Sequence, residues 1–445
     1  MSGSPEPVEV LARPDRRPTF IGARLSPPRH ARSTPSIFLK GEVANDLAPA
    51  PSRELTVAPQ RRPTGAPAPR RLEPARLEGW REASDFSPLE PADLLNQRRA
   101  GPEDTVRAPR FSAWDLRLAT AKYFLFWRHR ELWNYSFNFG ESGARYLQRI
   151  FGRRRLAKLD ELRHGERAFV VVRGLPTASF FFPYPKRHRD LHGGVTPRRF
   201  RHFDMVVAGL LFLAGAEVRR RYQNAAAPIV RTLLSAPTEP QVGDRDGSDM
   251  HLRFHQSTVE KAMPDPNLPA AGEDTCTVKA YAAVRNRRQI PIYVLPVKTV
   301  LERLPGEEFE WVMEQLERPV FQKLGPHFDN NDTAVMAEGQ PILRRGVARG
   351  DWLMSYDPDR VWTEDENAKR ALRKLRGAIM AARKDAIEII LDRRDVLIVD
   401  NLRALVARRE YYPFRATDAL RAAFFTKPRW LRLYYGFPLP HRDRR

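Results

Sequence analysis

Short apolar runs bounded by turn residues predict strands at several places along the chain. Residues 168–172 read Ala-Phe-Val-Val-Val and are followed by Arg-Gly-Leu-Pro, which is typical of a buried strand that ends in a turn. Similar strand-like patterns occur at residues 277–284, 290–295, 395–400 and 430–435.

Longer patterns between these strands predict helices. An aromatic stretch at residues 114–133 follows a possible N-cap at Ser112, so we expect ordered structure to begin near Phe111. Residues 203–221 are apolar and end in arginines, which suit the negative end of a helix dipole. Two further helices are predicted at residues 305–316 and 364–386.

The longest apolar run, residues 205–218, is interrupted by Gly209, Gly215 and Glu217. It is too short to span a bilayer and is expected to be a buried helix, so we predict no membrane span.

The first part of the chain has a different character. Residues 1–108 are rich in Pro, Arg, Ala and Ser, and their prolines oppose regular helix or strand. Such a segment cannot bury enough apolar surface to offset the entropy cost of ordering it. We therefore predict a disordered arm at residues 1–108, with docking of a protein partner as its possible role, and a folded domain at residues 109–445.

Strands with helical insertions between them predict an α+β fold with a jelly-roll-like core and helices packed outside it.

The chain has 445 residues and a formal net charge of +22, with 76 Lys and Arg. This charge fits attraction to nucleic acid or other anions, although no nucleic-acid-binding motif supports that interpretation and a genome biased toward Arg codons is the favoured explanation. One cysteine, Cys276, excludes disulfides within the chain and a thiolate-rich metal site. A single cysteine and the lack of a visible signal peptide fit a cytoplasmic protein.

Several motifs, each weak alone, occur in an order that resembles one known family. Leu-Arg-Phe-His-Gln-Ser at residues 252–257 resembles a segment that usually reads Phe-His-x-Glu or Phe-His-x-Asp, and Asp400-Asn401 resembles a strand end that leads into His-Gly-Arg. Further matching segments lie at residues 170–176, 213–215, 222–223, 229–230, 300–320 and 417–418. Across roughly residues 140–436 the series resembles the clavaminate synthase/TauD-like iron(II)/2-oxoglutarate oxygenases. The resemblance implies a double-stranded β-helix core, with iron(II) and 2-oxoglutarate as cofactors.

The resemblance also shows where the family's site is altered. That family holds iron with two His and one carboxylate, which leaves open positions for 2-oxoglutarate and oxygen. His255 is the one retained ligand. Ser257 stands where the family has the carboxylate, and Val406, which has no donor atom, stands where it has the second His. The sequence therefore predicts an incomplete metal site from which iron and 2-oxoglutarate binding have been lost.

The anchor for 2-oxoglutarate is altered as well. The family has an Arg directly after the Thr-Asp that Thr417 and Asp418 resemble, and here that position is Ala419. Arg421 lies two residues further on and would face the same way on a strand, where its guanidinium could bind a carboxylate. Arg415 is a second candidate. The resemblance places Thr417 among the cofactor-binding residues, and Asn401 and Arg408 in the substrate pocket.

Three functions follow from these observations. In the first, the protein is a pseudoenzyme that binds a small anionic or amino-acid-like ligand, or a partner protein, in the former active site. In the second, it is an active oxygenase with a rearranged site, which hydroxylates or desaturates a small amino-acid-derived substrate, with His255 as a ligand and Arg421 as the cosubstrate anchor. In the third, it is a basic nucleic-acid- or polyanion-binding protein, whose binding would weaken steeply with salt.

Overall fold

The computed structural model describes residues 70–71, 97–109, 136–175, 201–219, 230–234, 252–265, 272–286, 289–325, 335–346, 350–408 and 429–439. All of these residues belong to one compact unit, Gly65–Arg445. The predicted aromatic helix at residues 114–133 lies outside them. No helix in this part of the chain is long and apolar enough to cross a membrane.

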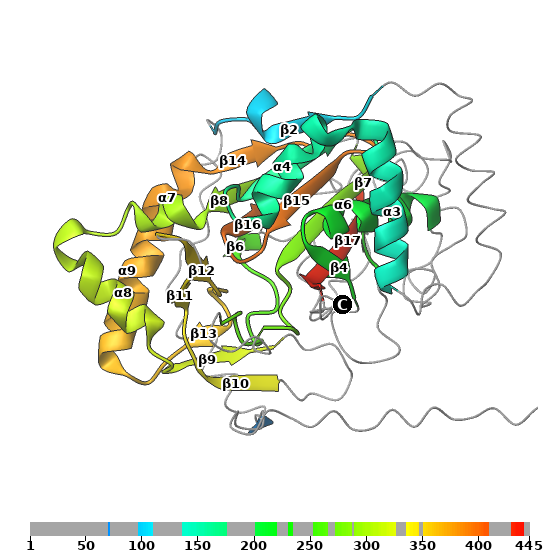
Figure 1. Cartoon of the computed structure of the whole chain (residues 1–445). Helices are drawn as coiled ribbons and strands as arrows, with labels where there is room; N and C mark the ends of the chain where they lie inside the picture. Colours follow the sequence, from blue (N-terminus) through cyan, green and yellow to red (C-terminus); the bar gives the residue numbers. More distant parts are fainter. Residues whose placement is uncertain are drawn as a thin grey trace, which may run out of the picture. The chain divides into compact units, whose positions relative to one another are not determined.

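Two β-sheets carry the central core (Figure 1). The larger sheet has the order β2 (Thr105–Arg107), β3 (Phe169–Arg173), β15 (Val396–Asp400), β7 (Val278–Asn286), β17 (Arg429–Pro438) and β4 (Ala216–Val218), and β5 (Val230–Leu234) also pairs with β17. The smaller sheet has the order β14 (Ile387–Ile389), β8 (Ile292–Pro296), β16 (Ala404–Arg408) and β6 (Leu252–His255). Neighbouring strands are antiparallel except β2 and β3.

The two sheets pack face to face because each contributes alternate residues to one apolar layer. On β15, Leu397 and Val399 belong to this inner layer, whereas Val396 and Ile398 belong to the layer on the other side of the sheet. Side chains alternate between the faces of a strand, so residues that are buried on both faces make β15 apolar throughout. The members from the other strands include Phe169, Val171, Tyr281, Ala283, Ile292, Val294, Ala404, Val406, Leu431, Leu433 and Tyr435.

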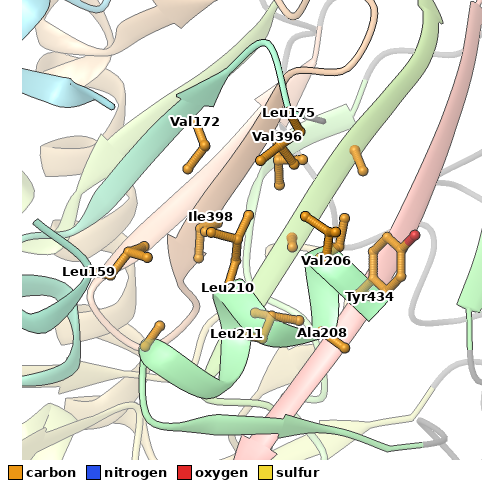
Figure 2. Close-up of a cluster of buried hydrophobic side chains, with 14 of the residues drawn as sticks. Leu159, Val172, Leu175, Val206, Ala208, Leu210, Leu211, Val396, Ile398 and Tyr434 are labelled. Atoms are coloured by element: carbon orange, nitrogen blue, oxygen red, sulfur yellow. The ribbon is translucent and has the colours of Figure 1, made fainter. Parts of the chain in front are cut away.

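Three helices cover the outer face of the larger sheet: α3 (Ser136–Phe151), α4 (Arg153–Arg163) and α6 (Arg201–Leu213). Figure 2 shows this layer, in which Leu159 of α4 and Val206 and Leu210 of α6 lie against Val172 and Ile398 of the sheet. All five side chains are buried. At roughly 1.5–3 kcal/mol for each large apolar side chain, this burial contributes strongly to stability.

A second group of elements packs on the outer face of the smaller sheet, where Tyr293, Leu295, Leu405 and Ala407 are buried. Its helices are α7 (Val297–Leu301), α8 (Phe309–Glu317) and α9 (Glu366–Ala382), with 3-10 turns η5 (Gly306–Glu308) and η6 (Arg383–Asp385). Its short strands are β9 (Phe321–Leu324), β10 (Val335–Gln340), β11 (Leu343–Arg345), β12 (Trp352–Met354) and β13 (Val361–Trp362), and β1 (Arg70–Arg71) pairs with β10. The predicted helices at residues 305–316 and 364–386 correspond to α8 and α9.

Part of the arm predicted to be disordered, residues 1–108, has regular structure, and the prediction is corrected there. Residues 102–104 form the 3-10 turn η2 (Pro102–Asp104), and β2 pairs in parallel with β3 at the edge of the larger sheet. Arg70 and Arg71 form β1. Backbone hydrogen bonds order these segments. Because β2 buries a single apolar side chain, Val106, the sequence shows no apolar pattern from which the strand could be predicted.

The predicted helix at residues 203–221 is also corrected. Helix α6 ends at Leu213, Gly215 adopts φ 81°, and the chain turns into β4. A positive φ suits glycine and is common just after a helix end. Apolar residues continue beyond the turn because Ala216 and Val218 are buried in strand β4. Apolarity alone therefore cannot show where the helix ends and the strand begins.

Candidate functional site

The pairing of β6 with β16 places two residues singled out by the sequence side by side. His255, at the end of β6, is the direct cross-strand partner of Val406 on β16. Directly opposed residues of an antiparallel pair point to the same face, with Cβ atoms about 4.5–5.5 Å apart. Val406 is 4% exposed and belongs to the apolar layer between the two sheets, so the imidazole and the isopropyl group lie on the inner side of the smaller sheet.

A backbone carbonyl group of the same strand fixes the orientation of the His255 ring. His255 is buried, and its Nδ1 lies 2.9 Å from the carbonyl oxygen of Arg253. A carbonyl oxygen only accepts, so Nδ1 carries the proton, and in the neutral ring the lone pair is on Nε2. This is the tautomer in which Nε2 can act as a base or as a metal ligand.

Ser257, two residues beyond His255, stands where the resembled family has a carboxylate ligand, and here it accepts a hydrogen bond from a lysine. Its Oγ accepts a hydrogen bond of 2.6 Å from Nζ of Lys279 on β7. Lys279 is 1% exposed and lies close to two aromatic rings, with Nζ 5.1 Å from the ring centroid of Tyr281 and 5.9 Å from that of Tyr435. An ammonium group on the inner face of the larger sheet therefore bonds to the residue in the carboxylate-ligand position.

Asn401 holds the backbone of Ser257 in place. The backbone N–H of Ser257 donates to Asn401 Oδ1 at 3.1 Å, and Asn401 Nδ2 donates to the carbonyl oxygens of Ser257 at 3.0 Å and of Cys276 at 2.8 Å. Asn401 follows β15 directly, so its amide joins the segment after β6 to the segment before β7. The sequence placed Asn401 in a substrate pocket; the structure gives this side chain three hydrogen bonds to backbone.

These residues do not fit an iron(II) ion. Val406 offers no donor atom, and the Ser257 hydroxyl lies within hydrogen-bond distance of a cation. A second cation at the same oxygen would be repelled by the ammonium. Among the residues that the structure describes, no group of three or more His, Cys, Asp and Glu is arranged to hold a metal ion.

The other predicted site residues are only partly in view. Arg408 ends β16 and is buried, and the pairing of β16 with β6 shifts its register between Val406 and Arg408. Arg415, Thr417 and Arg421 lie outside the described residues, so their role in binding 2-oxoglutarate stays a prediction. Cys276 is a buried thiol that donates to the carbonyl oxygen of Val278 at 3.2 Å.

Lys279 is the site residue that sequence reasoning missed, although a signal was present. In Val-Lys-Ala-Tyr-Ala-Ala-Val the lysine occupies the same face as Tyr281 and Ala283, and the strand is apolar on both sides of it. A lysine within a strand that is buried on both faces is rare unless it is paired.

Solved structures of two oxygenases resemble this chain. Asparagine oxygenase in complex with Fe(II), 2S,3S-3-hydroxyasparagine and succinate is 18% identical, with a TM-score of 0.53 over 75% of this chain and 93% of that one. The non-heme iron oxygenase OrfP in complex with Fe and alpha-ketoglutaric acid is 18% identical, with a TM-score of 0.52 over 74% of this chain and 93% of that one.

No protein-family model and no curated protein matches the sequence. Both structures are matched over most of their length, and the likeness concerns the fold. At the level of the fold they confirm the resemblance drawn from the sequence: this chain has the double-stranded β-helix fold of the iron(II)/2-oxoglutarate oxygenases.

Proposed function

We propose that this protein uses an oxygenase fold to bind a small anionic or amino-acid-like ligand, without the iron(II)/2-oxoglutarate chemistry of its structural neighbours. The observation that carries the proposal is the hydrogen bond from Lys279 Nζ to Ser257 Oγ, 2.6 Å long, in a buried environment. An ammonium group faces Ser257, the residue that the sequence resemblance puts at the family's carboxylate position. The same position thus repels a metal cation and attracts an anion.

Val406 supports the proposal independently. Val406 lies directly opposite His255 in the strand register. A second imidazole at this position could share a metal ion with His255. An isopropyl group at that point, 4% exposed, contributes to the apolar layer and not to a donor set. One imidazole and one hydroxyl make a weak site for a divalent iron ion, which in this fold needs three ligands on one face.

The kind of ligand is suggested by the neighbouring structures. Asparagine oxygenase is bound to 2S,3S-3-hydroxyasparagine and OrfP to (3S)-hydroxy-L-Arg, which are both amino acids, and both structures also contain succinate. An interior that carries Lys279, His255 and Arg408 favours ligands with a carboxylate.

A titration of metal-stripped protein with iron(II) and 2-oxoglutarate, without oxygen, tests the proposal. We expect no visible charge-transfer band from a chelated pair, and no iron retained after desalting in an elemental analysis. His255→Ala should behave like the wild type in both measurements. A saturable band that His255→Ala abolishes would overturn the proposal.

That outcome would favour the second function, an active oxygenase with a rearranged site. One observation speaks for it: His255 keeps the tautomer with the Nε2 lone pair that a metal ligand needs. Arg421 would then hold 2-oxoglutarate. Release of succinate that depends on an amino-acid substrate would be its further mark.

A further inference from the structure

Lys279 is a buried cation that has no counterion among the residues that the structure describes. Its side chain is 1% exposed, and its hydrogen bond is to the neutral hydroxyl of Ser257. No carboxylate in the described part of the chain lies within ion-pair distance of its Nζ. The faces of Tyr281 and Tyr435 are its other neighbours, and each such ring offsets only about 0.5–2 kcal/mol.

Acids at the two ends of the neighbouring strand β15, which pairs with β7, are already engaged elsewhere. Asp400, at the end of the neighbouring strand β15, pairs with Nη1 of Arg403 at 2.7 Å and accepts hydrogen bonds from the backbone N–H groups of Leu402 and Arg403. Asp395, at the other end of β15, pairs with Arg173 at 2.5 Å. Glu260 acts on a different lysine, Lys323, whose pKa it raises against the effect of burial.

An ammonium group has three donors, and one of them is used by Ser257. Burying a charge costs several kcal/mol unless it is paired and hydrogen-bonded. A carboxylate is the anion that suits this position, because it accepts two hydrogen bonds and neutralises the charge in one contact. The backbone of Ser257 is itself held by its two hydrogen bonds to Asn401, so the residue that accepts from Lys279 is fixed in place.

We propose that Lys279 is the carboxylate anchor of the ligand: its Nζ binds a carboxylate of the small anionic or amino-acid-like ligand directly, with no metal ion between them. This inference rests on the proposed function and names the chemical group and the residue that make the contact. In the proposed site the lysine supplies the positive charge that a metal would supply in an iron oxygenase.

Calorimetry on EDTA-treated protein tests this assignment, with succinate, 2-oxoglutarate, L-asparagine and L-arginine as probes and succinamide as an uncharged control. We expect at least one carboxylate, and not succinamide, to bind to the wild type. Lys279→Met should weaken that binding at least about tenfold, the minimum for losing a charge-assisted hydrogen bond. Lys279→Arg should retain part of it. The dicarboxylate and amino-acid probes separate the two ligand classes.

Lys323→Met is the matched control. Lys323 on β9 is also fully buried, but it donates to the carbonyl oxygen of Pro341 at 2.6 Å and lies outside the layer between the two sheets. Its substitution also removes a buried lysine amino group, and should leave carboxylate binding unchanged.

Equal binding by Lys279→Met and wild type would overturn the assignment, as would the absence of binding by every carboxylate in the panel. If Lys279→Met does not fold, the rate of Lys279 acetylation in the wild type decides, read by peptide mass spectrometry. A bound carboxylate should slow it, and an unchanged rate in the presence of a saturating probe refutes the anchor. Binding that requires added iron would instead overturn the proposed function.

Discussion

Lys323 is a buried lysine whose pKa is lowered by burial and by a neighbouring arginine. Burial lowers the pKa of Lys323 to about 7, and the nearby Arg344 acts in the same direction, whereas Glu260 opposes them. Both carboxylate oxygens of Glu260 are buried without a hydrogen-bond partner. The folded protein therefore releases this proton far more readily than the unfolded chain, whose lysine keeps the ordinary value of 10.5.

A stability measurement across alkaline pH follows from this shift. Between about pH 7 and 10.5 the unfolded chain binds a proton that the folded protein has released, so Lys323 makes the free energy of unfolding rise with pH in that window. Below pH 7 both states are protonated and the effect ends. Lys323→Met should remove a rise on the order of a few kcal/mol, measured by urea unfolding at pH 7 and pH 9.5. The more exposed Lys369→Met is the control, and a Lys323→Met effect that is the same at both pH values would contradict the shift.

At the level of single residues, the sequence predicted the two positions that the family resemblance defines. It put His255 and Val406 at ligand positions, and the strand register makes them neighbours. It could not predict the bond between Lys279 and Ser257, because that contact joins β7 of the larger sheet to the segment after β6 of the smaller sheet, and only the fold brings the two together. A resemblance indicates where a family has its functional groups, and not where a new one has entered.

At the scale of elements, helices α3 and α6 cross at two glycines. A Cβ atom on Gly143 would lie 2.1 Å from the carbonyl oxygen of Met205, and one on Gly209 would lie 2.3 Å from the backbone of Gly143. Neither backbone can move aside without separating the helices, so the absence of side chains sets how closely they approach. Helix α6 is in turn buried against the larger sheet.

A pair of glycine-to-alanine substitutions separates this packing effect from helix propensity. Gly143→Ala should destabilise the protein by about 1–3 kcal/mol or more, because the added methyl group overpacks the crossing. Gly377, in α9, has nothing within 4 Å of its Cβ position, and Gly377→Ala should stabilise by up to about 1 kcal/mol through helix propensity. Chemical denaturation of both variants checks the signs. Two stabilising substitutions would mean that the crossing is looser than described.

The sequence predicted elements best where one residue type dominates a run. The β-branched residues of β3 and β15 gave clear strands, and α9 followed a long helical period. The short strands β9 and β12 were missed, because Phe-Gln-Lys-Leu and Trp-Leu-Met are too brief to show a period and are ordered by the neighbours with which they pair.

At the scale of the whole molecule, one buried ion pair ties the helical layer to the larger sheet. Asp204 of α6 accepts from Arg432 of β17 at 2.8 and 2.7 Å, and the hydroxyl of Tyr434 donates to the same carboxylate at 2.5 Å. Burial and the Asp204 carboxylate raise the pKa of Tyr434 well above its usual value, which keeps the hydroxyl protonated as a donor. All three side chains are buried.

Asp204→Asn removes the carboxylate that pairs with the buried guanidinium of Arg432. We expect a loss of about 3–5 kcal/mol in the free energy of unfolding, as found when one partner of a buried pair is removed. The exposed pair of Glu366 and Lys369 is the control, and Glu366→Gln should change stability by no more than about 1 kcal/mol. Equal effects in the two variants would show that the buried pair does not hold the layers together.

The amino group of Lys279 belongs to the chain itself, so it is present in every folded molecule. A bound iron ion, by contrast, has to be acquired from the cell and is lost or oxidised when conditions change. Filling of the proposed carboxylate site is therefore expected to follow the concentration of its ligand, whatever the supply of iron or oxygen. A cellular response that depends on this site would persist in iron-starved and in anaerobic cells, where oxygenases of the same fold stop working.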